Sequence, residues 1–465
     1  MKTLKRNPWY IAAGCFLQMF LGMGLCSSFS MMLPEISAHT GISTGSISGN
    51  LTVAYLASFI VSMFFFKPLL RKFGAKKLLI FGDLLLMFHY ILYSYAETIW
   101  FLRICGTLGG LVTLFACATP VSVVITNWFV DKRSSVLAFI MGGYGFGGMI
   151  ILPIVGRLIA AYGYQVAYRC HALGGVLLLL VTIFMIVDDP AKLGVKPYGY
   201  EKAAEIAAAV AAKKEKESRQ GGLDLAAARR TPSYWLLWIG LAISSFPGVA
   251  FRFYNGAFFR GPIGLDTVTY SNWASVLSVC IAAGMILMGV MADKLGSVKM
   301  VVLMHVVSIV GYACAIVLMN NTGSFALLLV TVILCGMNGP LDNATAPYLI
   351  PEAFGRKYYD EIIGSYAGAM MIGNVCVPML LGGIISDGTA ASFGLAWKII
   401  IGFGAAAMVI LLVGLFKGRT ASSISRSERR KNSKKHLAQR RNEQWLIFRK
   451  FCIPAPASAP SRTRN

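Results

Sequence analysis

Charged residues within long apolar stretches of the sequence include Arg103, Arg252 and Asp342. A charge at the depth of a lipid bilayer is costly, so such residues usually face a cavity or a partner. Two guanidinium groups could hold an anion, whereas a carboxylate whose burial alternates could bind and release a proton. The alternatives are that both arginines extend toward lipid headgroups and that Asp342 makes only a structural hydrogen bond.

Neutral polar residues accompany these charges. Asn338 precedes Asp342 by four residues and shares its helix face, so we assign both residues to proton coupling. Gln18 and Asn374 lie near the middle of their apolar stretches. We assign them, with the two arginines, to substrate binding. For Gln18 and Asn374 the alternative is helix-to-helix packing.

The sequence around these residues is that of a membrane protein. Of its 465 residues, 56% are hydrophobic and only 14% are charged, and the mean hydropathy is +0.65. Apolar stretches of about 20 residues predict transmembrane helices. We therefore predict an all-α integral membrane protein with twelve transmembrane helices, at residues 9–33, 46–66, 77–95, 98–126, 134–160, 167–187, 234–258, 267–291, 299–319, 323–349, 361–385 and 394–416.

Two similar stretches divide the chain into halves. Residues 67–77, KPLLRKFGAKK, and residues 289–299, GVMADKLGSVK, have a similar spacing of glycine and lysine. The two stretches are 222 residues apart, so that Gly74 matches Gly296. Residues 188–235 form the one long polar break between predicted helices. The predicted domains are a six-helix bundle at 1–187, a cytoplasmic linker at 188–232, a second six-helix bundle at 233–416 and a basic cytoplasmic tail at 417–465.

The distribution of lysine and arginine predicts the orientation. With the N-terminus inside, fourteen basic residues lie on the cytoplasmic side and three on the other side. The positive-inside rule then places both termini in the cytoplasm of a multi-pass protein of the plasma membrane. On this orientation Arg103 lies roughly 9 Å below the outer end of its helix and Arg252 about 27 Å from the inner end of its own. Both arginines are thus expected in the outer half of the membrane, and Asp342 toward the cytoplasmic half.

The net charge of +23 does not indicate nucleic-acid binding. The tail from Lys417 to Asn465 alone holds fourteen basic and two acidic residues. A polybasic segment next to a transmembrane helix is typical of a contact with anionic lipids. We expect no nucleic-acid partner and a monomeric protein in the lipid bilayer.

Motifs for covalent chemistry are absent from the sequence. The ten cysteines include no C-x-x-C pair, and no metal-ligand spacing, phosphate-binding loop or nucleophile motif occurs. We therefore predict no catalytic residues, no metal and no cofactor, and we do not expect an enzyme.

The stretch GVMADKLGSVK resembles the loop signature of the major facilitator superfamily. Five residues match that signature: Gly289, Asp293, Lys294, Gly296 and Lys299. In the family this loop is a cytoplasmic latch that stabilises one access state. The resemblance implies the same conformational role for Asp293, without contact to substrate.

Longer segments resemble the branch of monocarboxylate transporters and oxalate/formate exchangers. They include NWFVDKRSSVLAFIMGGYGFGGMIILPIVGRLIAAYG from Asn127 and PEAFGRKYYDEIIGSYAGAMMIGNVCVPMLLGGIISD from Pro351. The sequence departs from this branch where an arginine of the eighth helix would stand, since Met285 is found there. The resemblance also implies that helices one, four, seven and ten line a central cavity. Helices three, six and nine, which carry Asp83 and three histidines, would lie at the periphery.

The resemblance implies a secondary transporter that works by alternating access. We expect it to carry a small organic anion similar to a monocarboxylate, by proton coupling or by exchange. A carrier of a neutral or amphipathic metabolite or drug is one alternative. A membrane sensor or receptor that does not transport is the alternative from another class of function.

Overall fold

The computed structural model describes residues 6–219, 222–342 and 345–418. Helices dominate these residues, and their β structure consists of two isolated bridges, Phe129 with Tyr198 and Gly222 with Gly355. Side chains at the helix starts accept hydrogen bonds from backbone N–H groups of the first turn. Four helices are capped in this way, by Thr98, Thr231, Asp266 and Ser324. The predicted basic tail lies outside the described residues from position 419 onward.

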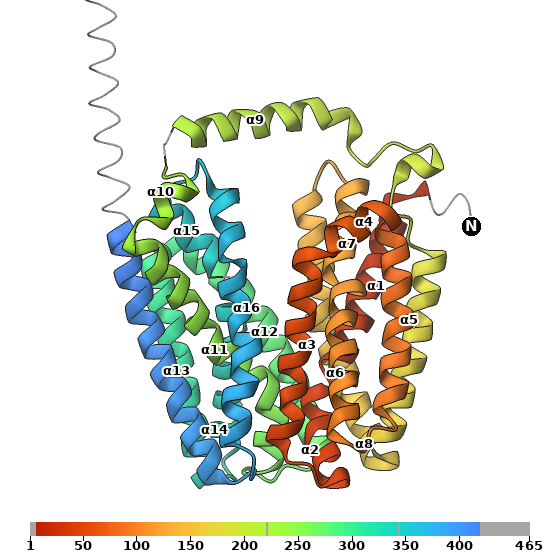
Figure 1. The fold of residues 1–465 in the computed structure, drawn as a ribbon, viewed down its shortest axis with the longest axis vertical. Coiled ribbons are helices and arrows are strands. Elements are labelled where there is room, and N and C mark those ends of the chain that lie inside the picture. The colour runs from red at the N-terminus through yellow and green to blue at the C-terminus, as the bar shows by residue number, and fades with distance from the viewer. Residues whose placement is uncertain (1–5, 220–221, 343–344, 419–465) are drawn as a thin grey trace, which may run out of the picture.

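The first half of the chain forms one bundle (Figure 1). Its helices are α1 (Pro8–Cys26), α2 (Phe29–Thr40), α3 (Thr44–Phe64), α4 (Phe66–Phe73), α5 (Ala75–Tyr93), α6 (Ile99–Phe115), α7 (Ala118–Trp128) and α8 (Arg133–Phe184). The 52-residue helix α8 is broken at Gly163, where φ is 80° and ψ is 167°, so it supplies two spans.

The second half forms a second bundle beside the first (Figure 1). Its helices are α11 (Pro232–Arg260), α12 (Thr267–Leu295), α13 (Ser297–Asn320), α14 (Phe325–Gly336), η4 (Gly339–Asp342), α15 (Ala346–Phe354), α16 (Tyr359–Ile384) and a last helix, Ala390–Gly418. The segment between the bundles contains η2 (Pro190–Leu193), η3 (Tyr200–Lys202), α9 (Ala203–Arg219) and α10 (Leu225–Arg229). Helix α9 runs across one end of the molecule, which we call the linker end (Figure 1).

The twelve-helix prediction agrees with these elements. Ten helical segments among the described residues are long and apolar enough to span a membrane. One of the ten is α8, which counts twice because of its break at Gly163. Helix α5 is the remaining span; its 19 residues include Lys76, Lys77 and Asp83, which lower its hydropathy.

The two halves repeat the same local geometry at the matched glycines. Gly74 precedes α5 with φ 79° and ψ 164°, and Gly296 precedes α13 with φ 81° and ψ 162°. Positive φ at these values strains any residue with a Cβ, so glycine is required at both turns. The same offset of 222 residues relates Asp83 of α5 to His305 of α13, and both are buried polar residues.

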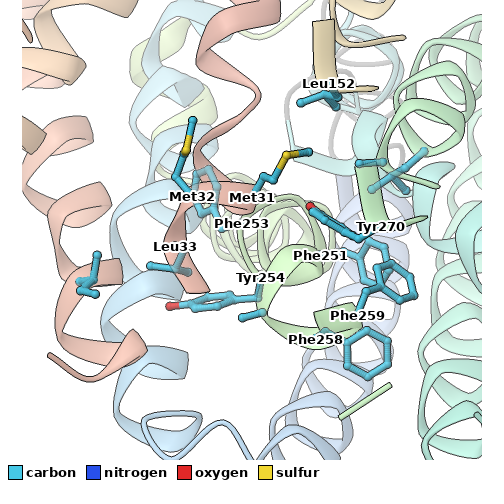
Figure 2. Packing of buried hydrophobic residues seen from close by; sticks show 14 of the residues in the cluster. Met31, Met32, Leu33, Leu152, Phe251, Phe253, Tyr254, Phe258, Phe259 and Tyr270 are labelled. Atoms are coloured by element: carbon cyan, nitrogen blue, oxygen red, sulfur yellow. The ribbon is translucent and has the colours of Figure 1, made fainter. Parts of the chain in front are cut away.

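The halves are joined at the end of the molecule where α2 ends, which we call the α2 end. Tyr254 of α11 donates a hydrogen bond to Ser48 of α3 at 2.8 Å, and Thr52 of α3 donates to the carbonyl of Val375 in α16 at 3.0 Å. Figure 2 shows Met31 and Leu33 of α2 near Tyr254, and all three side chains are buried. Apolar packing and hydrogen bonds therefore close this end of the interface.

Candidate substrate site

A cavity of about 590 Å³ lies between the two bundles. Its wall comes from α1, the Ser27–Ser28 bend, α2, α3, α5, α6 and α8 of the first half, and from α11, α12, α14 and η4 of the second. Volumes of this order hold molecules of metabolite or drug size. Arg252 is the residue with a permanent charge among the described residues of the wall.

Arg252 is held by two partners from other helices. Its Nη1 donates to Oδ2 of Asp342 at 2.6 Å, and its Nη2 donates to Oδ1 of Asn374 at 2.6 Å. The Arg252 side chain is 27% exposed and the Asp342 side chain 3% exposed. The guanidinium therefore faces the cavity while the carboxylate lies behind it.

The broken tenth span brings Asp342 to this position. Helix α14 ends at Gly336, and η4 continues the chain to Asp342. A Cβ on Gly248 of α11 would lie 2.8 Å from the carbonyl oxygen of Asn338, so glycine lets α11 and η4 approach closely. The expected separation of Arg252 and Asp342 into opposite halves of the membrane is wrong. The two residues are instead joined by the 2.6 Å contact between Nη1 of Arg252 and Oδ2 of Asp342.

Several polar atoms next to this ion pair have no hydrogen bond among the described residues. They are Oδ1 of Asp342, Nε of Arg252 and both side-chain atoms of Asn338. Buried polar atoms normally have partners, so unpaired ones concentrate at sites that bind water or ligand. Asn338 lies just before η4 and Asp342 at its end, and the backbone carbonyl of Asn338 and the Cβ of Asp342 both lie close to Gly248 of α11.

Aromatic side chains surround the guanidinium. The Arg252 Cζ lies 5.1 Å from the centre of the Phe253 ring, which packs at 5.6 Å against the ring of Tyr55. Phe253, Tyr55 and Tyr144 all line the cavity that the guanidinium faces. The sequence analysis missed them, because an aromatic residue in an apolar stretch looks like any core residue. The position of Phe253 next to Arg252 was the one available signal.

Arg103 and Gln18 are not part of the cavity wall. Arg103 is half-buried on α6, and its Nη2 lies 3.1 Å from the place where a Cβ on Gly49 of α3 would be. Gln18 donates to Oδ1 of Asp83 at 2.5 Å and to the carbonyl of Ala116 at 3.1 Å inside the first bundle. The structure thus brings together Arg252, Asn374, Asp342 and Asn338 and leaves these two residues apart from them.

The histidines of the third, sixth and ninth spans are buried rather than exposed at the edge of the bundles. His89 of α5 is bonded to the carbonyl oxygen of Cys105 at 2.9 Å and also lines the cavity, which its expected peripheral position did not foresee. His171 and His305 are hydrogen-bonded to Ser28 and Ser244, at 2.8 and 3.1 Å. These histidines join neighbouring helices of one bundle.

The predicted latch residues lie at the linker end. Gly289, Asp293 and Lys294 belong to the last turns of α12, Gly296 forms the turn, and Lys299 belongs to the first turn of α13. Asp293 is exposed, and the described part of the chain offers it no ion pair or hydrogen bond. Asp293 is therefore free in a structure whose halves are closed at the opposite end.

The wall of the cavity in the first half carries neutral polar groups. The Tyr168 hydroxyl has no hydrogen bond among the described residues. Asn50 lies near the Tyr93 hydroxyl, yet neither of its side-chain polar atoms makes a hydrogen bond of good geometry. The cavity therefore has a cationic side in the second half and a neutral polar side in the first.

The described residues contain no group of three or more histidine, cysteine, aspartate or glutamate side chains arranged to hold a metal ion. The polar groups of the cavity are suited to binding an organic molecule by charge and by hydrogen bonds.

Comparison with known proteins agrees with this architecture. The family model of the Major Facilitator Superfamily matches residues 14–269 and 237–458. The chain is 22% identical over 380 residues to YhjX, an MFS-type transporter of Escherichia coli, covering 80% of this chain and 87% of that protein. It is 20% identical over 372 residues to the oxalate:formate antiporter of Oxalobacter formigenes, covering 79% and 83%.

Solved structures share the fold at low sequence identity. The nucleoside transporter NupG superposes with a TM-score of 0.66 at 12% identity, covering 87% of this chain and 99% of that one. A bacterial homologue of the lysosomal transporter Spinster, in an inward-facing and unoccupied conformation, superposes with a TM-score of 0.61 at 13% identity, covering 90% and 97%. The chain belongs to the major facilitator superfamily, and it is a multi-pass membrane transporter and not an enzyme.

Proposed function

We propose that this transporter carries a small organic anion together with a proton. The observation that supports this is the Arg252 guanidinium, which faces the cavity while paired with the buried Asp342 carboxylate. The charges of Arg252 and Asp342 balance each other. An uncompensated charge in such surroundings is strongly unfavourable, so the site favours ligands that keep the sum near zero.

Binding of an anion alone would leave an excess negative charge beside Arg252. Protonation of Asp342 alone would leave an excess positive charge. The two events together keep the site neutral, so each one favours the other. We therefore assign anion binding to Arg252 and Asn374, and proton binding to Asp342 with Asn338 beside it. Arg103 and Gln18 are left out because they neither line the cavity nor bond to Arg252 or its partners.

Alternating access requires that the closed end of the interface can open and that the other end can close. We propose that the contacts at the α2 end separate in the second state, and that Asp293 then gains a partner at the linker end. With the linker and both termini in the cytoplasm, as the positive-inside rule favours, the present structure is closed toward the outside. We place the protein in the plasma membrane as a monomer whose halves are the two bundles.

Exchange without proton movement remains an alternative for the same site. The oxalate:formate antiporter among the relatives is a protein of that kind by its name. In exchange, Asp342 stays charged, and one anion replaces another at Arg252. A carrier of neutral or amphipathic molecules is the other alternative, because the pair of Arg252 and Asp342 is already neutral.

Proton uptake on binding separates these possibilities. The purified protein is first tested against acetate, lactate, pyruvate, benzoate and their neutral amides for thermal stabilisation, which reports binding to the folded state. The strongest binder is then mixed with the protein in weak buffer while the pH is recorded. We expect uptake of about one proton per anion, and therefore about tenfold tighter binding for each unit by which the pH falls.

Arg252→Gln should abolish anion binding, and Arg103→Gln is the matched control that should retain it. Anion binding without proton uptake contradicts symport and leaves exchange. Preferred binding of the amides contradicts the anion assignment.

A further inference from the structure

We infer that the preferred substrate is an aromatic monocarboxylate with a hydrogen-bonding group at the end opposite its carboxylate. This inference rests on the proposed function, because it takes Arg252 as the site of the carboxylate. It goes beyond that function by specifying three features of the substrate: a single negative charge, an aromatic ring, and a polar group at the end opposite the carboxylate.

The charge of the substrate follows from the charge of the wall. Arg252 is the permanent charge among the described residues that line the cavity, and Asp342 already compensates it. One carboxylate and one proton keep this balance. A dicarboxylate brings a second negative charge for which the described wall has no cation, so the site favours a monoanion over oxalate.

The size of the cavity and the aromatic residues that line it favour a substrate with an aromatic ring. A volume of about 590 Å³ is several times larger than formate, acetate or oxalate needs. Phe253, Tyr55 and Tyr144 line the cavity with Arg252; the Phe253 ring lies 5.1 Å from the guanidinium and 5.6 Å from the Tyr55 ring. Aromatic rings at such spacings attract a further ring beyond simple burial of apolar surface. A planar ring attached to the carboxylate therefore fits this end better than an aliphatic chain.

Polar groups of the wall that lack hydrogen bonds favour a substrate with a polar group opposite its carboxylate. Asn50 precedes Tyr55 by five residues on α3, which corresponds to about 7 Å along the helix. Its amide and the Tyr168 hydroxyl line the cavity, and both lack hydrogen bonds among the described residues. A benzene ring with a para substituent spans a comparable length. A hydroxyl or amide at that position would give these groups a partner, which unpaired buried groups favour.

The test compares five small probes on the purified wild-type protein. They are 4-hydroxybenzoate, benzoate, cyclohexanecarboxylate, oxalate and the uncharged 4-hydroxybenzyl alcohol. We expect 4-hydroxybenzoate to bind most tightly, about fivefold better than benzoate through the added hydrogen bond. Benzoate should in turn bind about fivefold better than cyclohexanecarboxylate through the ring contacts.

Variants then locate the ring. Phe253→Leu should lower the affinity for benzoate more than the affinity for cyclohexanecarboxylate, and so remove the preference between the two. Phe246→Leu is the matched control, since Phe246 lies on the same helix, packs against Phe403 and does not line the cavity. Asn50→Ala should remove the advantage of 4-hydroxybenzoate over benzoate.

The outcomes separate this inference from the proposed function. If cyclohexanecarboxylate or oxalate binds as tightly as 4-hydroxybenzoate, and binding still requires Arg252, the inference is wrong and the anion transporter stands. If 4-hydroxybenzyl alcohol binds and the carboxylates do not, the proposed function is wrong as well. Absence of any binding by 4-hydroxybenzoate also overturns the inference. The wild-type comparison does not depend on whether the variants fold.

Discussion

Two carboxylates are buried within the bundles in opposite kinds of surroundings. Asp83 of α5 is completely buried inside the first bundle and accepts hydrogen bonds from Gln18 and Thr182, at 2.5 and 2.6 Å. Asp342 of η4 lies behind the cavity wall, bonded at 2.6 Å to the partly exposed Arg252. Neutral donors of one bundle satisfy the first carboxylate, whereas the second depends on a cation that a ligand can reach.

This difference indicates which carboxylate can change during transport. The partners of Asp83 come from α1 and α8 of the same bundle, so a movement of the two halves leaves them in place. The partner of Asp342 faces the space between the halves, so an anion or water there alters the balance of charge. Both carboxylates are buried, so we base the proposed coupling role of Asp342 on its partner Arg252, which faces the cavity.

Removal of the cation from Asp342 has the largest expected effect. Arg252→Gln leaves Asp342 buried without its partner, which typically costs 3–5 kcal/mol of stability. It also removes the charged donor for the anion, so we expect at least about a 100-fold loss of anion affinity. The thermal unfolding temperature and the dissociation constant are measured for this variant and for Arg252→Gln with Asp342→Asn. The double variant should regain stability and still bind no anion; recovery of anion binding in it would contradict the role of Arg252.

Removal of the Asp83 carboxylate should affect stability more than transport. Asp83→Ala leaves the Gln18 amide and the Thr182 hydroxyl without their acceptor, and each unsatisfied buried group costs about 1–3 kcal/mol. We expect a lower unfolding temperature but normal proton-driven uptake per folded molecule. Asp83→Asn keeps the size of the side chain and serves as the control that should lose less stability. Loss of proton coupling in Asp83→Asn would contradict the purely structural role that we assign to Asp83.

A substitution of Asp293 tests whether contacts form at the linker end when those at the α2 end separate. Its carboxylate is exposed at the linker end and has no ion pair or hydrogen bond with the residues that the structure describes. If it gains a partner in the second state, Asp293→Asn removes about 1 kcal/mol from that state. Turnover should then slow about fivefold while the dissociation constant of the anion stays the same. Loss of binding with an unchanged cycling rate would exclude a latch.

The smallest effect is expected at the α2 end. Glu35 of α2 lies 2.8 Å from Arg260 of α11, and both side chains are partly exposed. Partly exposed ion pairs contribute about 0.2–1 kcal/mol, so Glu35→Gln should raise the population open at this end by at most about fivefold. The measurement is the rate of thiol labelling of Ser30→Cys, a residue of the cavity wall, by a reagent added on the α2 side. Slower labelling in Glu35→Gln would show that this pair does not hold the end closed.

The sequence was sufficient for the fold because the signals for it are local. Apolar stretches predicted the twelve spans, and the 222-residue offset matched Gly74 with Gly296, which share one backbone conformation. Residues of the site could be chosen only as rare charges in apolar sequence. Arg252, Asp342 and Asn374 lie in one cluster, whereas Arg103 lies against Gly49 outside the cavity wall. Composition does not show whether a polar side chain on a helix faces the cavity or a neighbouring helix.

Distances along the membrane were less predictable than the helices themselves. The sequence placed Asp342 in the cytoplasmic half of the tenth predicted span, whereas in the structure α14 ends at Gly336 and η4 brings Asp342 to within 2.6 Å of Arg252. The aromatic wall of Phe253, Tyr55 and Tyr144 could not be told from core residues, because its assembly depends on contacts between the halves.

Accumulation under a pH gradient by Asp342→Asn tests the central claim most directly. The variant and the wild type are reconstituted into vesicles with the anion that gives the strongest thermal stabilisation. Asparagine keeps a hydrogen-bond acceptor for Arg252 but cannot bind or release the proton. We predict that the variant exchanges internal for external anion within about threefold of the wild-type rate, since Arg252 is retained, but does not accumulate anion when the gradient is applied. Accumulation equal to that of the wild type would contradict the account and leave Asp342 as a structural partner of Arg252.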